Sequence, residues 1–169
     1  GHVGETVMNK LKSERGGFIH ELYSLRVVDY LANYGKGMNL TYAVRDGIVT
    51  HCGEKFEQSI TPDFKEKDLQ AIDARDRYPS TWEGVVVRMA DKIAYLGRDV
   101  EDAVQLKIIE KKDILTEVVT VLGSSNSEII SSLVSDVISY SSESGSIGFS
   151  DEIYNAMKVL KEFNYKSIY

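Results

Sequence analysis

The sequence predicts an all-α protein. In several segments apolar residues recur at three- and four-residue spacing, which is the period of a helix that packs on one side. Capping residues and glycine breaks separate these segments, as expected at helix ends. No segment alternates apolar and polar residues over a length that would make a strand, and no internal repeat occurs. We therefore expect a bundle of helices.

The longest helical pattern covers residues 79–106, and we expect the helix to begin near Thr81. Ser80 can cap its first turn while Glu83 reaches back to the cap, as in a capping box. The expected core face consists of Val86, Met89, Ile93, Leu96, Val100 and Val104. The opposite face carries Arg88, Asp91, Tyr95, Arg98, Asp99 and Asp102.

Two interpretations of this polar face remain open. It can be a solvated face with salt bridges between residues three and four positions apart. It can also face a ligand or another part of the protein, because Tyr95 places a phenol among charges. Gly84 and Gly97 each cost the helix about 1 kcal/mol relative to alanine, which favours a close approach by a neighbouring backbone or a ligand.

Shorter helices are expected on both sides of this segment. Their boundaries follow from apolar spacing, from capping serines and aspartates, and from glycines that end a helix. The expected helices cover residues 4–13, 18–33, 40–52, 67–75, 113–122, 126–140 and a last segment capped by Ser150. The expected buried faces are Phe18, Leu22, Leu25, Val28 and Ala32 in the second, and Leu40, Val44, Ile48 and Cys52 in the third. His51, in a last helical turn, is interpreted as structural.

Composition narrows the function further. The 169 residues suit one domain or a piece of one, and the net charge of −6 gives no general attraction to nucleic acid or anionic membrane. A single cysteine excludes an internal disulfide framework and fits a reducing compartment. No apolar run is long enough to span a bilayer. We expect a cytoplasmic protein without a membrane partner.

Four segments occur in the order in which one known family carries them. They are GHVGE, FIHELYSLR, LTYAVRDGIVTH and EGVVVRMADKIAYLGRDVEDA. Together they resemble the deoxyguanosine triphosphate triphosphohydrolases, the deoxynucleotide-hydrolysing branch of the HD-domain phosphohydrolases. The resemblance implies part of a helical HD-type catalytic core over residues 1–106. Residues 107–169 are then a C-terminal helical extension that could form an interface.

The resemblance implies a metal site and a substrate site on the long helix. Asp91 matches a ligand of the divalent metal, which can be manganese, magnesium, iron or zinc. Lys92 and Tyr95 match residues that bind the triphosphate, and Asp99 matches the residue that contacts the deoxyribose 3′-hydroxyl. The family's first metal-binding histidine and its His-Asp pair would lie upstream of Gly1.

The resemblance also implies catalytic residues near the start of the chain. His2 matches the catalytic histidine, Glu5 the acid that orients it, and His20 a second active-site histidine. The residues alone do not make His20 catalytic, because Ser24 stands where a zinc-protease HExxH motif needs its second histidine. The family often has asparagine and glutamine where this chain has Glu21 and Tyr23.

The implied activity is metal-dependent hydrolysis of deoxynucleoside triphosphates to deoxynucleoside and tripolyphosphate. Since the chain opens inside a motif, we expect it to be an inactive piece of a longer enzyme, although Gly1 and His2 could also be the remnant of a tag. A degenerate HD-like module that binds nucleotide without hydrolysis is the alternative. We expect a homo-oligomer, with nucleic acid only as a regulator.

Overall fold

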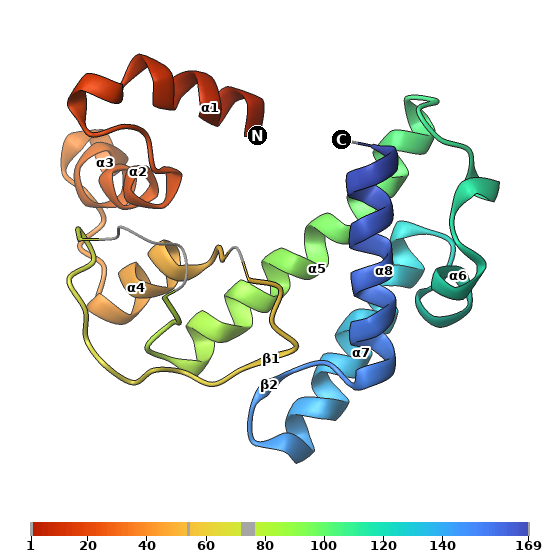
Figure 1. Ribbon diagram of the computed structural model, residues 1–169. Coiled ribbons are helices and arrows are strands. Elements are labelled where there is room, and N and C mark those ends of the chain that lie inside the picture. Colours follow the sequence, from red (N-terminus) through yellow and green to blue (C-terminus); the bar gives the residue numbers. More distant parts are fainter. Residues whose placement is uncertain (1, 54, 72–76, 169) are drawn as a thin grey trace. The chain divides into compact units, whose positions relative to one another are not determined.

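The computed structural model describes residues 2–53, 55–71 and 77–168, with the side chains of residues 2 and 3 left out. Helices make up nearly all of its regular structure, and the predicted all-α fold class is confirmed (Figure 1). The longer elements are α1 (His2–Leu11), α2 (His20–Arg26), α4 (Tyr42–Thr50), α5 (Trp82–Gln105), α6 (Thr116–Leu122), α7 (Asn126–Ser144) and α8 (Asp151–Ser167). The shorter ones are η1 (Ser13–Arg15), η2 (Val27–Leu31), α3 (Ala32–Gly35), η3 (Lys111–Asp113), β1 (Ser59–Ile60) and β2 (Ile147–Gly148).

The chain forms two compact units, and both take part of α5. Unit 1 comprises Gly1–Lys55 and Pro62–Val85, and unit 2 comprises Phe56–Thr61 and Val86–Tyr169. The predicted division at residue 106, between a catalytic core and an extension, concerns function and stays a prediction. None of the helices in the described part of the chain combines the length and apolar character that crossing a bilayer requires.

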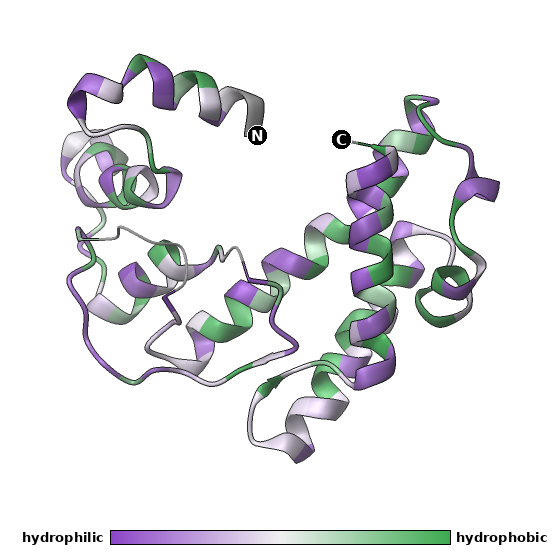
Figure 2. Ribbon diagram, in the orientation of Figure 1, coloured by the Kyte–Doolittle hydropathy of each residue, from purple (hydrophilic) through white to green (hydrophobic). Residues whose placement is uncertain are grey.

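The core of unit 1 is small. Leu25 of α2, Val49 of α4 and Leu69 of the following loop are buried together, with Leu22, Val28, Tyr42 and Ile48 packed partly against them. By contrast, Val7, Met8 and Leu11 of α1 are exposed, and Figure 2 shows both hydrophobic and hydrophilic colours along this helix. The apolar spacing in this segment therefore predicted the helix correctly, but it does not show what the apolar side chains pack against.

The predicted helix over residues 18–33 is broken into three pieces. α2 passes into the π-helical turn η2, and Asn33 then has a left-handed backbone with φ of 53°. A π turn adds a residue to one helical turn and shifts every later side chain around the axis. Of the predicted face, Leu25 is buried and the other members are partly buried, and Ala32 is the member that follows the π turn.

The predicted face of the third helix was right only in part, since Ile48 packs against the core of unit 1. Leu40 precedes α4, and Val44 is exposed, whereas Asp46, Gly47, Val49 and Thr50 are buried. A Cβ atom added to Gly47 would lie 3.6 Å from the Cα of Gly84 in α5. Two glycines thus let two helix backbones approach, which explains one of the glycines inside the long helix.

The start of α5 differs in detail from the prediction. The Thr81 hydroxyl accepts a hydrogen bond from the Gly84 N–H at 3.1 Å, so Thr81 caps the helix. Ser80 instead binds Asp46, donating from its N–H at 2.7 Å and from its hydroxyl at 2.9 Å. The competing acceptor is 34 residues away in sequence, so local sequence could not reveal it.

The core face of α5 was predicted correctly except at its ends. Met89, Ile93, Leu96 and Val100 are buried, whereas Val86 is 52% exposed and Val85 and Ala103 take the end positions. At Gly97 an added Cβ would lie 3.3 Å from the Ile129 Cβ of α7, so a neighbouring helix approaches the second glycine as expected. The buried face of α5 and its contact with α7 thus belong to the core of unit 2.

The remaining helices of unit 2 follow their predicted caps closely. Ser125 and Glu128 form the predicted capping box at the start of α7, and Ser150 occupies the N-cap position of α8. Asp113 does not start α6; it pairs with Glu110 in a box around η3. α7 continues to Ser144, and β2 follows at Ile147–Gly148. β2 pairs antiparallel with β1.

The segment between α4 and α5 contains the predicted helix over residues 67–75. Residues 67–71 form no helix, and residues 72–76 lie outside the described part of the chain. Arg77 donates to the Asp68 and Ala71 carbonyls at 3.1 and 2.8 Å, so it binds the main chain of this segment.

Candidate functional site

In unit 1, His20 lies at the first position of α2 between two carboxylates. Its Nδ1 lies 3.2 Å from Glu5 Oε1 and 3.5 Å from Glu21 Oε2. A carboxylate only accepts, so Nδ1 carries the proton and donates it. The His20 side chain is 33% exposed, whereas that of Glu21 is 2% exposed. The two acids therefore fix the tautomer and the orientation of a histidine that solvent can still reach.

The other nitrogen of His20 faces a sulfur. His20 Nε2 lies 3.3 Å from Cys52 Sγ, just after α4. The ring of His51 meets the His20 ring edge-on, with centroids 5.5 Å apart. His51 Nδ1 donates to the Ile48 carbonyl at 2.7 Å, as expected for a residue in a last helical turn. The side chains of His20, His51 and Cys52 thus lie next to one another.

This arrangement equips His20 to exchange a proton. A carboxylate that holds Nδ1–H stabilises the imidazolium that forms when Nε2 takes a proton. The structure pairs Glu5 with His20, whereas the sequence predicted that Glu5 orients His2, whose side chain lies outside the description. Sequence reasoning missed the approach of Cys52 to His20, because 32 residues separate them.

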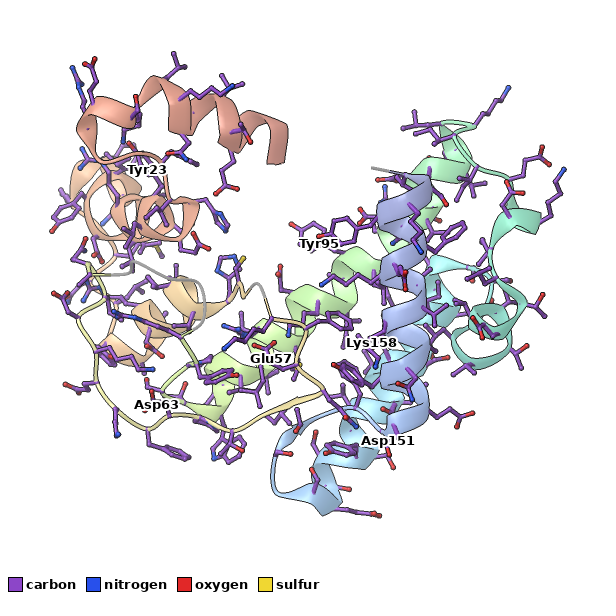
Figure 3. All side chains as sticks on the ribbon, in the orientation of Figure 1. Tyr23, Glu57, Asp63, Tyr95, Asp151 and Lys158 are labelled. Atoms are coloured by element: carbon purple, nitrogen blue, oxygen red, sulfur yellow. The ribbon has the colours of Figure 1, made fainter. Side chains whose placement is uncertain are left out.

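In unit 2, the other predicted site residues follow one side of α5. Asp91, Tyr95 and Asp99 are spaced four residues apart, which places them on one face of a helix. Asp91 and Asp99 are partly buried, and Tyr95 stands out from α5 with 62% of its surface exposed (Figure 3). This face of α5 therefore offers one phenol and two carboxylates to a ligand.

Lys92 belongs to a buried charge cluster that the sequence did not predict. Glu57, labelled in Figure 3, accepts from Arg88 at 2.8 Å and from the Lys92 ammonium. The Arg88 side chain is 0% exposed and that of Glu57 9%. Arg88 was placed on the polar face, but Glu57 takes it into the interior, where a charge needs a partner.

The cluster shifts the pKa of both titrating partners. Burial raises the pKa of Glu57, but the Lys92 hydrogen bond and the charges of Lys92 and Arg88 outweigh burial and lower the pKa overall. Burial lowers the pKa of Lys92, and the hydrogen bond from Lys92 to Glu57 only partly offsets it. Any anion that binds Lys92 must therefore compete with Glu57.

The far end of the polar face supports the solvated interpretation. Arg98 pairs with Glu101 at 3.2 Å and with Asp102 at 3.0 Å, and all three side chains are largely exposed. Such pairs contribute between about 0 and 1 kcal/mol to stability. The two interpretations thus apply to different parts of the same helix.

Asp91 is a suitable ligand for a divalent metal, but it does not form a complete metal site with the other described residues. A partly buried carboxylate is a suitable oxygen ligand for manganese, magnesium, iron or zinc. However, the groups of three or more ligating side chains among the described residues do not include Asp91. Asp91 can therefore supply one ligand.

The chain is similar along its whole length to curated proteins named deoxyguanosinetriphosphate triphosphohydrolase-like protein. The relative from Caldanaerobacter subterraneus subsp. tengcongensis is 37% identical over 170 residues, covering 100% of this chain and 43% of the relative. That from Clostridium tetani is 35% identical over 173 residues, covering 99% and 44%. That from Desulfatibacillum aliphaticivorans is 37% identical over 172 residues, covering 100% and 45%. The chain thus spans less than half of these relatives, and no family model matches it.

Proposed function

We propose that this chain, which belongs to the family of deoxyguanosinetriphosphate triphosphohydrolase-like proteins, is part of the catalytic region of a deoxynucleoside triphosphate triphosphohydrolase. The whole protein would convert the substrate, of the dGTP type, to deoxynucleoside and tripolyphosphate. The observation that carries this proposal is the contact of Glu5 with His20 at 3.2 Å. It joins two of the four motif segments into one acid–base pair.

His20 is the proton-transfer group that this geometry supports best. Glu5 accepts from Nδ1–H, and Glu21 Oε2 lies 3.5 Å from the same nitrogen, so Nε2 is the atom that can take or give a proton during attack at phosphorus. His2, from the first motif, is proposed as a second catalytic histidine. Glu5 would then serve the histidines by orienting them and by stabilising their protonated forms.

The substrate would be bound by residues of α5. The exposed Tyr95 phenol can donate to a phosphate oxygen, and the Asp99 carboxylate can accept from the 3′-hydroxyl of a deoxyribose. Lys92 would reach the triphosphate by exchanging its Glu57 carboxylate for a phosphate oxygen. Phosphoryl transfer depends mainly on such positioning and on neutralisation of charge.

The metal would use Asp91 as one ligand. A bound divalent ion lowers the pKa of a coordinated water and neutralises phosphate charge. Asp91 sits one residue before Lys92 and four before Tyr95, so one helix would carry the metal ligand and the phosphate-binding groups. Homo-oligomeric assembly, which the resemblance implies, and a cytoplasmic location remain parts of the proposal, with nucleic acid only as a regulator.

The test is tripolyphosphate release by the full protein, with each deoxynucleoside triphosphate and manganese, for Asp91→Asn and Asp102→Asn. Asp102 is a matched control, because it is an aspartate on the same helix whose side chain is 48% exposed beside Arg98. Asp91→Asn should lose activity by several orders of magnitude while Asp102→Asn keeps it. Equal activity in both variants would refute the role of Asp91.

Nucleotide binding measured by equilibrium dialysis separates the proposal from its alternative. A full protein that binds deoxynucleoside triphosphate with manganese but releases no tripolyphosphate would be a nucleotide-binding module of regulation or assembly. Turnover of any of the four nucleotides would exclude it.

A further inference from the structure

We infer that His20, His51 and Cys52 form a binding site for a thiophilic divalent ion, with zinc as the best fit. Asp91, the metal ligand proposed above, is not one of these three residues. Each of the three side chains offers one ligand atom, and these atoms lie within 4.8 Å of one another. All three residues belong to unit 1, where α2 begins and α4 ends.

The distances suit a tetrahedral ion after a small contraction. Bonds of about 2.0 to 2.1 Å to nitrogen and about 2.3 Å to sulfur place neighbouring ligand atoms roughly 3.3 to 3.6 Å apart. His20 Nε2 and Cys52 Sγ are already 3.3 Å apart. The His51 ligand atom lies within 4.8 Å of both, so a small approach of His51 is the remaining adjustment.

Both imidazoles are held in the tautomer that a metal needs. His51 donates Nδ1–H to the Ile48 carbonyl at 2.7 Å, which leaves the lone pair on Nε2. His20 directs Nδ1 toward Glu5 and Glu21, which leaves its lone pair on the nitrogen that faces Cys52. Metal-binding histidines in general donate their second nitrogen to a carboxylate or a carbonyl, which fixes the ring.

The donor set also indicates which ion binds. A thiolate with two imidazoles selects zinc or cobalt over magnesium and manganese, which prefer oxygen ligands. On binding, the Cys52 thiol releases its proton to solvent and the thiolate bonds to the ion. All three side chains are partly exposed, so an ion can enter, and a water or a neighbouring carboxylate can fill the fourth position.

The experiment is a cobalt titration of the full protein carrying Asp91→Asn, followed by absorbance, with zinc added afterwards. Tetrahedral cobalt bound to a thiolate gives a sulfur-to-metal charge-transfer band, and zinc should abolish it by displacement. Cys52→Ser should remove the band, and His51→Gln should weaken cobalt binding at least tenfold. This readout does not depend on nucleotide hydrolysis, so it stands whether or not the proposed activity is found.

Matched controls separate a bound ion from unspecific effects. Chain folding is checked by circular dichroism for each variant, and Ser24→Ala, one turn from His20 in α2, should keep the band. A band that persists in Cys52→Ser, or the absence of any band in folded protein, would overturn the site. The alternative in that case is a simple hydrogen bond between the thiol and His20.

If the proposed function also holds, zinc should inhibit it. Zinc would occupy Nε2 of His20, the atom to which we assign proton transfer. The ratio of manganese-supported turnover with and without micromolar zinc should then be lower in the unmodified protein than in Cys52→Ser. Equal ratios together with a cobalt band would retain the ion site and refute the catalytic role of His20.

Discussion

Replacing Glu57 by glutamine should destabilise the protein strongly, because it leaves two buried cations without their carboxylate. The side chains of Glu57, Arg88 and Lys92 are 9%, 0% and 10% exposed. Removing one partner of a buried ion pair typically costs about 3 to 5 kcal/mol. We expect the lower end, about 3 kcal/mol, because Lys92 can lose its proton when the carboxylate is gone.

The assay is urea unfolding of the full protein, followed by far-ultraviolet circular dichroism. A loss of about 3 kcal/mol corresponds to a fall in melting temperature of roughly 6 to 12 °C for a domain of this size. Glu162→Gln is the matched control, since Glu162 pairs with Lys166 on α8 and both side chains are largely exposed. The control should change stability by less than about 0.5 kcal/mol. A loss below about 1 kcal/mol for Glu57→Gln would refute the reasoning.

The same variant predicts a pH dependence with a definite sign. The pKa of Glu57 is lower in the folded protein than in the unfolded chain, so its ionised form stabilises the fold. This contribution is complete above the unfolded pKa of about 4.3 and is lost as pH falls through the folded pKa. The difference between Glu57→Gln and the unmodified protein should therefore be largest near neutral pH and shrink in acid. A difference that grows below pH of about 4 would contradict the assignment.

Three further predictions concern local features. Gly148→Ala should cost about 1 to 3 kcal/mol of stability, because the new Cβ would lie within 2.6 Å of the main chain of β1. Gly4→Ala, where a new Cβ meets no atom within 4 Å, should instead stabilise α1 by up to about 1 kcal/mol. Thermal unfolding compares the two variants, and equal effects would contradict the contact at Gly148. Ser125→Ala should cost about 1 kcal/mol by removing the hydroxyl that accepts from the main chain of α7. Ser150→Ala, at an N-cap without a side-chain hydrogen bond, should cost less in the same measurement, and the reverse order would refute the assignment. Tyr95→Phe should leave stability unchanged, because the phenol is exposed, and should raise KM for the nucleotide; unchanged kinetics would remove Tyr95 from the proposed site.

Local sequence predicted the helices of unit 2 well because their signals are local. The capping box of Ser125 and Glu128 acts within one turn, and the spacing of Met89, Ile93 and Leu96 depends only on the helix period. The resemblance to the triphosphohydrolases likewise rested on contiguous motifs. Such motifs can indicate a family without knowledge of any tertiary contact.

Prediction failed where a distant residue competes for a side chain. Ser80 gives its hydroxyl to Asp46 rather than to the helix start, and Glu57 draws Arg88 from the expected polar face into the interior. The π turn in η2 and the left-handed Asn33 interrupt the second predicted helix, because a change of period cannot be read from apolar spacing alone.

The sequence by itself determined the all-α class, most helix boundaries and the family, because helix period, caps and motifs are written in neighbouring residues. Only the tertiary structure decided which polar residues meet. It joined Glu5 to His20 across 15 residues and His20 to Cys52 across 32. Such contacts depend on how helices pack, and packing is fixed by the whole chain rather than by any one segment.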